Sequence, residues 1–300
     1  APILATDRPL VARRDGRLVF PAFADLPLAR WLAPSRAASA PDPASLESLV
    51  RPPIPYSFRG IRLDETLRPP DRRHLMGTDS LGRDLLARIL HGIRPALLVG
   101  FAASAAGLLA GIALGAAAAL RRGLLDLAIM RLVDTLACFP AFVLALAWVA
   151  ASGRGGLPPL IAGIALSRVA GAARYVRGEI LKQRGSELWV SARASGCTGP
   201  RLVARHLMPL LLPALAVIGA FGVAHAVVLE ASLGFIGFGV EPPVPSWGSL
   251  LAESRHTLGV AWWPVLFPSL GLFLTLLSLC VLGERLAGWG REPHRPAGWE

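Results

Sequence analysis

Long apolar runs alternate with short polar segments along this chain. The five longest runs cover residues 95–120, 127–152, 157–176, 210–229 and 261–283. Because about 20 apolar residues in a helix are enough to cross the hydrocarbon core of a bilayer, each run is long enough for one span. The pattern predicts an all-α polytopic membrane protein with five transmembrane helices, which occupy residues 93–289.

The composition agrees with a membrane protein and excludes some functions. Hydrophobic residues make up 53% of the chain and charged residues 17%, and the mean hydropathy is +0.52. The net charge of +11 is almost entirely arginine, since Lys182 is the only lysine. No Gly-x4-Gly-Lys motif is present, so any ATP must be bound by another chain. The arginines gather at the ends of the apolar runs without interleaved aromatic residues, which suits anionic lipid and argues against nucleic acid.

The segment before the first run divides into two parts. Residues 1–73 are rich in proline and carry charges of both signs. They indicate a water-facing, largely irregular segment, with a possible pair of short strands at 9–11 and 18–20 around the turn Asp15-Gly16. Residues 74–92 predict an amphipathic helix that lies in the membrane interface and is capped by Asp79 or Ser80. For His74, Asp79 and His91, capping and interface polarity are favoured over a metal site or a catalytic role.

Local features of the apolar runs predict how they pack. Gly107, Gly111 and Gly115 recur at every fourth residue of the first run and predict a seam of close helix contact. Pro140 should kink the second run. Arg131 and Asp134 are spaced i and i+3, so they can form an ion pair near the start of that run.

A polar loop at residues 178–209 separates the third run from the fourth. Ser186 can cap a helix with Glu187 in its first turn, Gly196 can end that helix, and Gly199-Pro200 can begin another. Seven basic residues gather in and just before the loop: Arg174, Arg177, Lys182, Arg184, Arg193, Arg201 and Arg205. The positive-inside rule therefore places the loop in the cytoplasm. By parity, residues 1–92 and a proline- and glycine-rich loop at 234–260 lie outside, and the tail at 290–300 lies inside.

The loop carries the sequence S-A-R-A-S-G-x9-H-L-M-P. It resembles the cytoplasmic EAA loop of permease subunits of bacterial ABC importers, in which a coupling helix sits in a groove of the ATPase subunit. The Glu-Ala-Ala triplet of that family reads Val190, Ser191 and Ala192 here, so the acidic residue is absent. The glycine and proline keep the family spacing. The resemblance implies that these residues dock on the ATPase: Glu187, Ser191, Ala192, Arg193, Ala194, Gly196, Cys197, Arg205, His206 and Pro209.

Two further stretches resemble the dipeptide, oligopeptide and nickel permeases of this family. The motif G-T-D-x-x-G-R-D consists of Gly77, Thr78, Asp79, Gly82, Arg83 and Asp84. The second stretch, at residues 229–253, reads LEASLGFIGFGVEPPVPSWGSLLAE. Residues 1–73 resemble, more weakly, the extracytoplasmic insert of the oligopeptide and microcin-C branch. Because such permeases usually have six spans, a first helix upstream of Ala1 is also expected.

The resemblance implies a type I ABC importer permease fold and an ATP-driven importer of dipeptides or oligopeptides in the bacterial inner membrane. The runner-up substrate is nickel or a metal chelate. The expected partners are a second homologous permease, two ABC ATPase subunits, an extracytoplasmic substrate-binding protein and membrane lipid. The chain itself is expected to bind no cofactor and to be no enzyme, with ATP and Mg²⁺ held by the ATPase chains. An ion-driven secondary transporter is the alternative class, and a membrane enzyme ranks third.

His225 and Glu230 are the ionisable side chains in or beside the fourth run. Such groups inside a membrane mark functional sites by default, so both are candidates for lining a translocation path. The alternative is that His225 forms a hydrogen bond within the helix bundle and Glu230 marks the end of the span. The sequence leaves both interpretations open.

Overall fold

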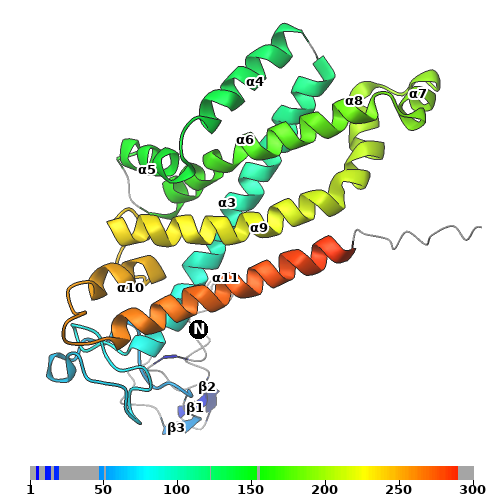
Figure 1. Ribbon diagram of the computed structural model, residues 1–300. Helices are drawn as coiled ribbons and strands as arrows, with labels where there is room; N and C mark the ends of the chain where they lie inside the picture. Colours follow the sequence, from blue (N-terminus) through cyan, green and yellow to red (C-terminus); the bar gives the residue numbers. More distant parts are fainter. Residues whose placement is uncertain are drawn as a thin grey trace, which may run out of the picture. The chain divides into compact units, whose positions relative to one another are not determined.

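The computed structural model describes residues 5–6, 11–14, 17–19, 47–50, 52–121, 123–153 and 156–289. Its elements are the strands β1 (Val11–Arg14), β2 (Arg17–Val19) and β3 (Glu47–Val50), the 3-10 helix η3 (Leu63–Glu65), and the helices α3 (Leu85–Arg121), α4 (Leu124–Ala137), α5 (Ala141–Ala151), α6 (Leu157–Gln183), α7 (Glu187–Ala194), α8 (Gly199–Leu202), the π-helical η4 (Val203–Leu207), α9 (Met208–Ile236), α10 (Trp247–Ser254) and α11 (Trp263–Trp289) (Figure 1). They form two compact units. Unit 1 contains Ala1–Ala96 and Gly234–Leu272, and unit 2 contains Leu97–Leu233 and Phe273–Glu300.

A small antiparallel sheet lies in the N-terminal segment, with strand order β2-β1-β3. Two short strands do pair around the predicted turn, with Arg14 opposite Arg17, but the first is Val11–Arg14 and shares only Val11 with the predicted strand at 9–11. The predicted turn residues Asp15 and Gly16 lie outside the described residues. The pairing of β1 with β3 joins segments more than 30 residues apart, and no local signal predicted it.

Helix α3 is a single continuous helix of 37 residues. The predicted start at Asp79 or Ser80 is wrong, since the helix begins at Leu85 and Asp84 caps it. Oδ1 of Asp84 accepts a hydrogen bond from the backbone N–H of Ala87 at 2.8 Å, which satisfies one of the free N–H groups of the first turn. The expected interfacial helix and the first apolar run therefore join without a break.

The glycine seam is confirmed in unit 2. A Cβ atom added to Gly111 would lie 2.4 Å from the Cβ of Ala172, and one added to Gly115 would lie 2.4 Å from the carbonyl oxygen of Ala173. A Cβ at Gly107 would lie 2.7 Å from the carbonyl oxygen of Ala165. Because no side chain fits in these gaps, α3 and α6 pack backbone to backbone.

The second apolar run is broken into α4 and α5, which meet at an angle of 94°. Pro140 caps α5, so the predicted kink is confirmed and is a complete break. The predicted pairing of Asp134 with Arg131 is wrong. Asp134 instead accepts from Arg174 of α6 at 2.8 Å. Because α4 packs against α6, the nearer cation for Asp134 comes from the neighbouring helix.

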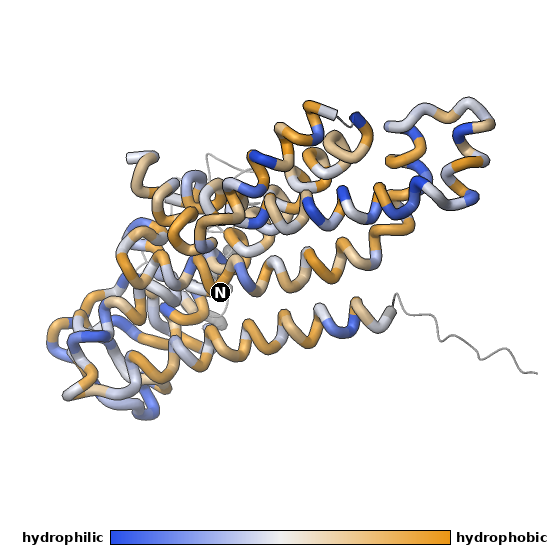
Figure 2. Tube along the Cα trace, turned by 45° about the horizontal axis from the view of Figure 1, so that its top comes forward, coloured by the Kyte–Doolittle hydropathy of each residue, from blue (hydrophilic) through white to orange (hydrophobic). Residues whose placement is uncertain are grey.

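Three helical stretches are long and apolar enough to cross a membrane: Leu85–Arg121, Gly199–Ile236 and Trp263–Gly288. The bent pair α4 and α5 gives a fourth if it counts as one span. Apolar residues colour most of the length of α9 and α11 in Figure 2. Helix α6 is not among these spans, although it has 27 residues, because Arg168, Arg174 and Arg177 lower its hydropathy. Three or four of the five predicted spans are therefore confirmed.

The loop after the fourth run has its own helix. Helix α9 passes through Gly234 and ends at Ile236. The helix therefore ends about one turn later than the predicted start of the loop at residue 234. Helix α10 begins at Trp247, and the side chains and backbone of Ser246 and Ser249 form a capping box. The side chain of Trp247 is buried beside Gly92 and Gly271 in unit 1.

Candidate functional site

The loop between α6 and α9 folds as its sequence predicts. The hydroxyl of Ser186 accepts a hydrogen bond from the N–H of Trp189 at 3.3 Å and caps α7. Glu187 lies in the first turn, where its carboxylate interacts favourably with the helix dipole. Helix α7 is eight residues long, and its start is fixed by this cap.

The end of α7 is a Schellman motif centred on Gly196. The N–H of Cys197 donates to the carbonyl of Ala192 at 3.0 Å, and the N–H of Gly196 donates to the carbonyl of Arg193 at 3.0 Å. Gly196 has a φ of +78°, a left-handed conformation that glycine adopts without steric penalty. The glycine that keeps the family spacing therefore has a specific local role.

The chain re-enters the fourth run through α8 and η4. Thr198 is the N-cap of α8, and Pro200 lies in its first turn, as predicted. Pro209 has no N–H to donate, and just before it the ladder shifts by one residue, so that the N–H of Met208 donates to the carbonyl of Val203. This single π turn leaves Arg205 and His206 exposed.

Two contacts hold α7 to the rest of unit 2. The guanidinium of Arg184 donates to the carbonyl of Ala119, at the C-terminal end of α3. The same guanidinium lies 5.4 Å from the ring centroid of Trp189 in α7. Trp189 also packs against a buried apolar cluster that contains Leu202 and Leu207. Through these contacts α7 is connected to the end of α3 and to the apolar cluster below the beginning of α9.

The predicted docking residues divide by exposure. Ala192 and Cys197 are partly buried against the apolar cluster, so they support the loop. The exposed members are Glu187, Ser191, Arg193, Ala194, Gly196, Arg205, His206 and Pro209. Sequence reasoning missed Leu188 and Val190, which are exposed by 44% and 60%. A large apolar side chain in a short, otherwise polar loop is the signal that would have indicated them.

The motif at residues 77–84 belongs to a cluster of charges in unit 1. Asp79 accepts from the backbone N–H groups of Leu81 and Arg83 at 2.8 and 3.0 Å. It also pairs with the side chains of Arg83 and Arg88. Both arginines in turn pair with Glu253 of α10, at 2.6 and 2.7 Å. The motif at 77–84 and the stretch at 229–253 therefore meet in one neutral cluster of four charges.

The remaining motif residues are held by hydrogen bonds and close packing. His74 is buried, and its ring nitrogens lie 2.8 Å from Asp84 and 3.3 Å from Glu65. A hydrogen bond from Arg62 lowers the pKa of the Glu65 carboxyl. The carbonyl of Thr78 accepts from the indole N–H of Trp263 at 3.1 Å.

The glycines of this motif pack closely against neighbouring residues. Gly77 packs under the ring of Trp263, and Gly82 packs against the backbone of Arg62. His91 contacts the carbonyl of Ala87 at 2.9 Å. Within the part of the chain that the structure describes, no three histidine, cysteine, aspartate or glutamate side chains group as metal ligands.

The two candidates for a translocation path lie in different environments. His225 is exposed on α9, whereas Glu230 is fully buried. Five residues in an α-helix correspond to a rotation of about 140° beyond one full turn, so the two side chains leave α9 on different faces. The structure does not bring them together on one surface.

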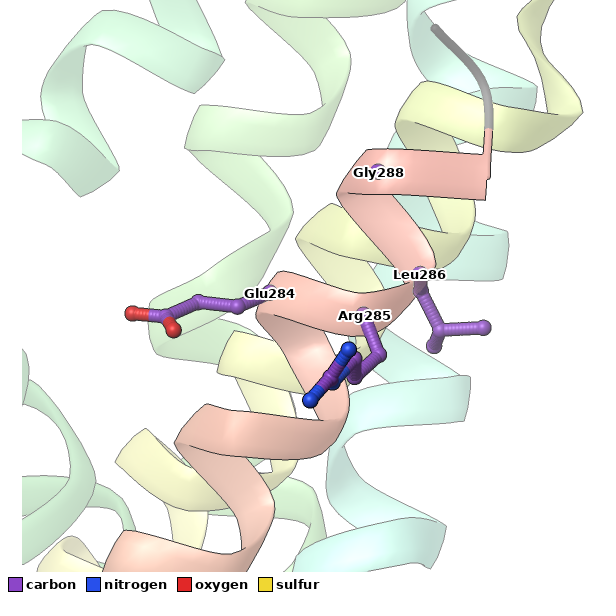
Figure 3. A pocket seen from close by; sticks show the side chains of 4 residues that line it. All are labelled: Glu284, Arg285, Leu286 and Gly288. Atoms are coloured by element: carbon purple, nitrogen blue, oxygen red, sulfur yellow. The ribbon is translucent and has the colours of Figure 1, made fainter.

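Helix α11 ends in a short charged segment. Glu284, Arg285, Leu286 and Gly288 line a hollow beside its last turns, and Figure 3 shows the side chains of Glu284 and Leu286 on opposite sides of the helix. These residues all come from one helix. The hollow is therefore the surface of a helix end, where the apolar run meets polar residues.

Unit 2 thus combines apolar helices with a folded, exposed loop. The family described as the binding-protein-dependent transport system inner membrane component matches residues 89–289. The chain belongs to this family. This permease is 36% identical over 217 residues to the glutathione transport system permease protein GsiD of Pectobacterium atrosepticum, covering 72% of each chain. It is 36% identical over 220 residues to the dipeptide transport system permease protein DppC of Alkalihalophilus pseudofirmus, covering 73% of this chain and 72% of that one.

The fold is also similar to a solved structure. The permease superposes on a chain of the MetNI methionine ABC transporter, solved in inward-facing conformations, with a TM-score of 0.59 and 19% identity. The similarity covers 69% of this chain and 98% of that chain. The permease therefore has the type I ABC importer permease fold, and it is a multi-pass component of an inner membrane.

Proposed function

We propose that this permease moves di- or oligopeptides into the bacterial cytoplasm as part of an ATP-driven importer. The observation that carries the proposal is the exposed, double-capped helix α7, tied to α3 through Arg184 and Trp189. Its relatives named as dipeptide and glutathione permeases support the substrate class. The other chains of the importer are a second permease, two ATPases that hold ATP and Mg²⁺, and an external peptide-binding protein.

The coupling mechanism follows from the capped ends of α7 and from its contacts with the rest of unit 2. The ATPase pair binds α7 in a different position in each of its nucleotide states. A ligand shifts a conformational equilibrium only by its difference in affinity for the two states, so the exposed face of α7 must contact the two ATPase states unequally. Arg184 and the apolar cluster around Leu202 then convert this difference into movement of α3 and α9.

The proposed orientation places α7 in the cytoplasm and α10 with its flanking loops outside. In a variant whose Cys138, Cys197 and Cys280 are replaced by serine, a cysteine at Val260 should react with a membrane-impermeant maleimide added to intact cells. Val260 is 78% exposed. A cysteine at Lys182, whose side chain is 73% exposed and which is not among the docking residues, should react only after the membrane is opened. The reverse pattern would show that the orientation is inverted.

The function itself is tested with the assembled importer in liposomes. The purified complex should contain a second permease and an ATPase. The liposomes should accumulate labelled trialanine only when both ATP and the binding protein are present. Replacing Gly196 by valine should lower uptake by roughly tenfold or more, because a β-branched residue in the left-handed region costs about 1–3 kcal/mol and disrupts the end of α7. ATP hydrolysis should continue.

Two variants serve as controls for Gly196. Asparagine tolerates the left-handed conformation, so Gly196→Asn should retain most of the uptake. Gly185→Ala adds a Cβ in open space near the same loop and should have no effect. Uptake by Gly196→Val equal to that of the unmodified permease would remove the end of α7 from the mechanism, and uptake of Ni²⁺ in place of trialanine would overturn the peptide assignment.

A further inference from the structure

An arginine lies near the middle of three helices of unit 2. Arg168 is close to halfway along α6, and it packs against Gly107 of α3 and Gly222 of α9. A Cβ at Gly222 would lie 2.4 Å from Nη2 of Arg168 and 2.4 Å from Oγ of Ser104. The glycines of α3 and α9 therefore leave room for a guanidinium near the middle of these helices. A charged side chain at such a position does not stabilise an apolar helix.

The guanidinium lacks an acidic partner within the described residues. Its Nη2 donates a hydrogen bond to the carbonyl of Ile218 at 3.3 Å. The carboxylates of α4 pair with other arginines of α6, Asp134 with Arg174 and Asp126 with Arg177. Because a guanidinium has five N–H groups in a planar fork, most of its donors are free for an anion.

The surface beside Arg168 is open. Arg168 is partly exposed, and Gly171, one turn further along α6, is exposed with nothing within 4 Å of its Cβ position. His225 is exposed on α9 and lies close enough to Arg168 for an electrostatic interaction. Charged groups in the middle of membrane helices face the bundle interior or a water-filled cavity and seldom lipid. Arg168 and His225 are therefore two polar groups on an exposed part of α6 and α9, and the exposed apolar residues Phe221 and Val228 of α9 lie one turn to either side of His225.

We propose that Arg168 binds the C-terminal carboxylate of the peptide as it passes the middle of the membrane. The inference rests on the proposed function and assigns a residue to it. A lipid headgroup carries an anion too, but it lies at the membrane surface, about 15 Å from the bilayer centre.

The chemistry favours a fixed guanidinium for this task. A carboxylate that leaves water loses several kcal/mol of hydration, and a planar fork of N–H donors offsets part of that loss by bidentate contact. The same positive charge opposes the passage of a bare metal cation. The site needs only weak affinity, since a permease must release its substrate to the cytoplasm.

The test combines a change in the permease with a change in the peptide and measures uptake by the assembled importer in liposomes. Labelled trialanine and trialanine amide are each supplied at concentrations that saturate the binding protein. Arg168→Met should lower uptake of trialanine about tenfold, to near the rate of the amide, and should change uptake of the amide by less than about twofold. Arg168→Lys should retain part of the preference for the free acid. Arg174→Met, which removes an exposed charge from the same helix, is the matched control.

Several outcomes would overturn the inference. Equal losses for the acid and the amide would show a structural role for Arg168, and unchanged uptake of both would show no role. Loss of the second permease from purified Arg168→Met complexes would show that Arg168 pairs with an acidic residue of that permease and not with the peptide. An unmodified complex that imports neither peptide would defeat the proposed function itself, whereas normal import of both by Arg168→Met would defeat only this inference.

Discussion

Replacing Arg88 by methionine should destabilise the permease by about 3–5 kcal/mol, the effect of removing one partner from a buried ion pair. Arg88 is 3% exposed and contacts Asp79 and both carboxylate oxygens of Glu253. Without it, Asp79 remains buried with only Arg83 to balance it. We expect a clear fall in the thermal unfolding midpoint of the purified protein and a lower yield from the membrane.

The comparison variants separate charge from geometry. Arg88→Lys keeps the charge, but an ammonium cannot bridge two carboxylates as a planar fork does. Its thermal unfolding midpoint should therefore lie between those of the unmodified permease and Arg88→Met. Arg94→Met removes an exposed arginine from the same helix and should leave the midpoint unchanged. If Arg88→Met unfolds at the same temperature as the unmodified permease, the cluster does not stabilise unit 1.

The charge cluster also shows what a single sequence cannot predict. Asp79 has the residue type of a helix cap, yet its carboxylate serves a turn and two arginines, and Asp84 caps α3 instead. Glu253, which binds the same two arginines as Asp79, is 165 residues from Arg88 along the chain. Local propensity cannot weigh a contact over that distance, so the predicted cap lies four or five residues before the observed one.

The loop at α7 is the opposite case. The cap at Ser186, the acid at Glu187 and the left-handed Gly196 each act through atoms within five residues. The sequence therefore predicts both ends of the helix correctly. The exposure of Val190 and the partial burial of Ala192 depend on the cluster around Leu202, which forms only in the tertiary fold.

Helix periodicity could have corrected one hypothesis in advance. His225 and Glu230 are both ionisable and close in sequence, but five residues place them on different faces of a helix. No local signal in the sequence assigns a role to Arg168. Its candidate role follows from Gly107 and Gly222, which lie on two other helices and make room for it.

Replacing Gly111 by leucine should have the second large effect, through the seam between α3 and α6. The position of a Cβ at Gly111 is 2.4 Å from the Cβ of Ala172, 2.9 Å from the carbonyl oxygen of Val169 and 3.0 Å from the N–H nitrogen of Ala173. Two of these are backbone atoms of α6, which cannot move without the whole helix. Overpacking of this kind costs typically about 1–3 kcal/mol, and more for a large side chain.

The damage should reach transport as well as stability. If α3 moves away from α6, the carbonyl of Ala119 moves away from Arg184, and α7 loses its contact with α3. We therefore expect Gly111→Leu to lower both the thermal midpoint and ATP-driven uptake of trialanine. Gly111→Ala should show a smaller loss of both.

The matched control for the seam is Gly288→Ala in α11, where an added Cβ meets nothing within 4 Å. It should leave the midpoint and the uptake unchanged, because alanine also favours a helix over glycine. An unchanged midpoint for Gly111→Ala would contradict the close approach of the two helices. A lower midpoint with normal uptake would show instead that α7 is coupled to the bundle through the apolar cluster around Leu202 and Leu207, and that its contact with the end of α3 contributes little.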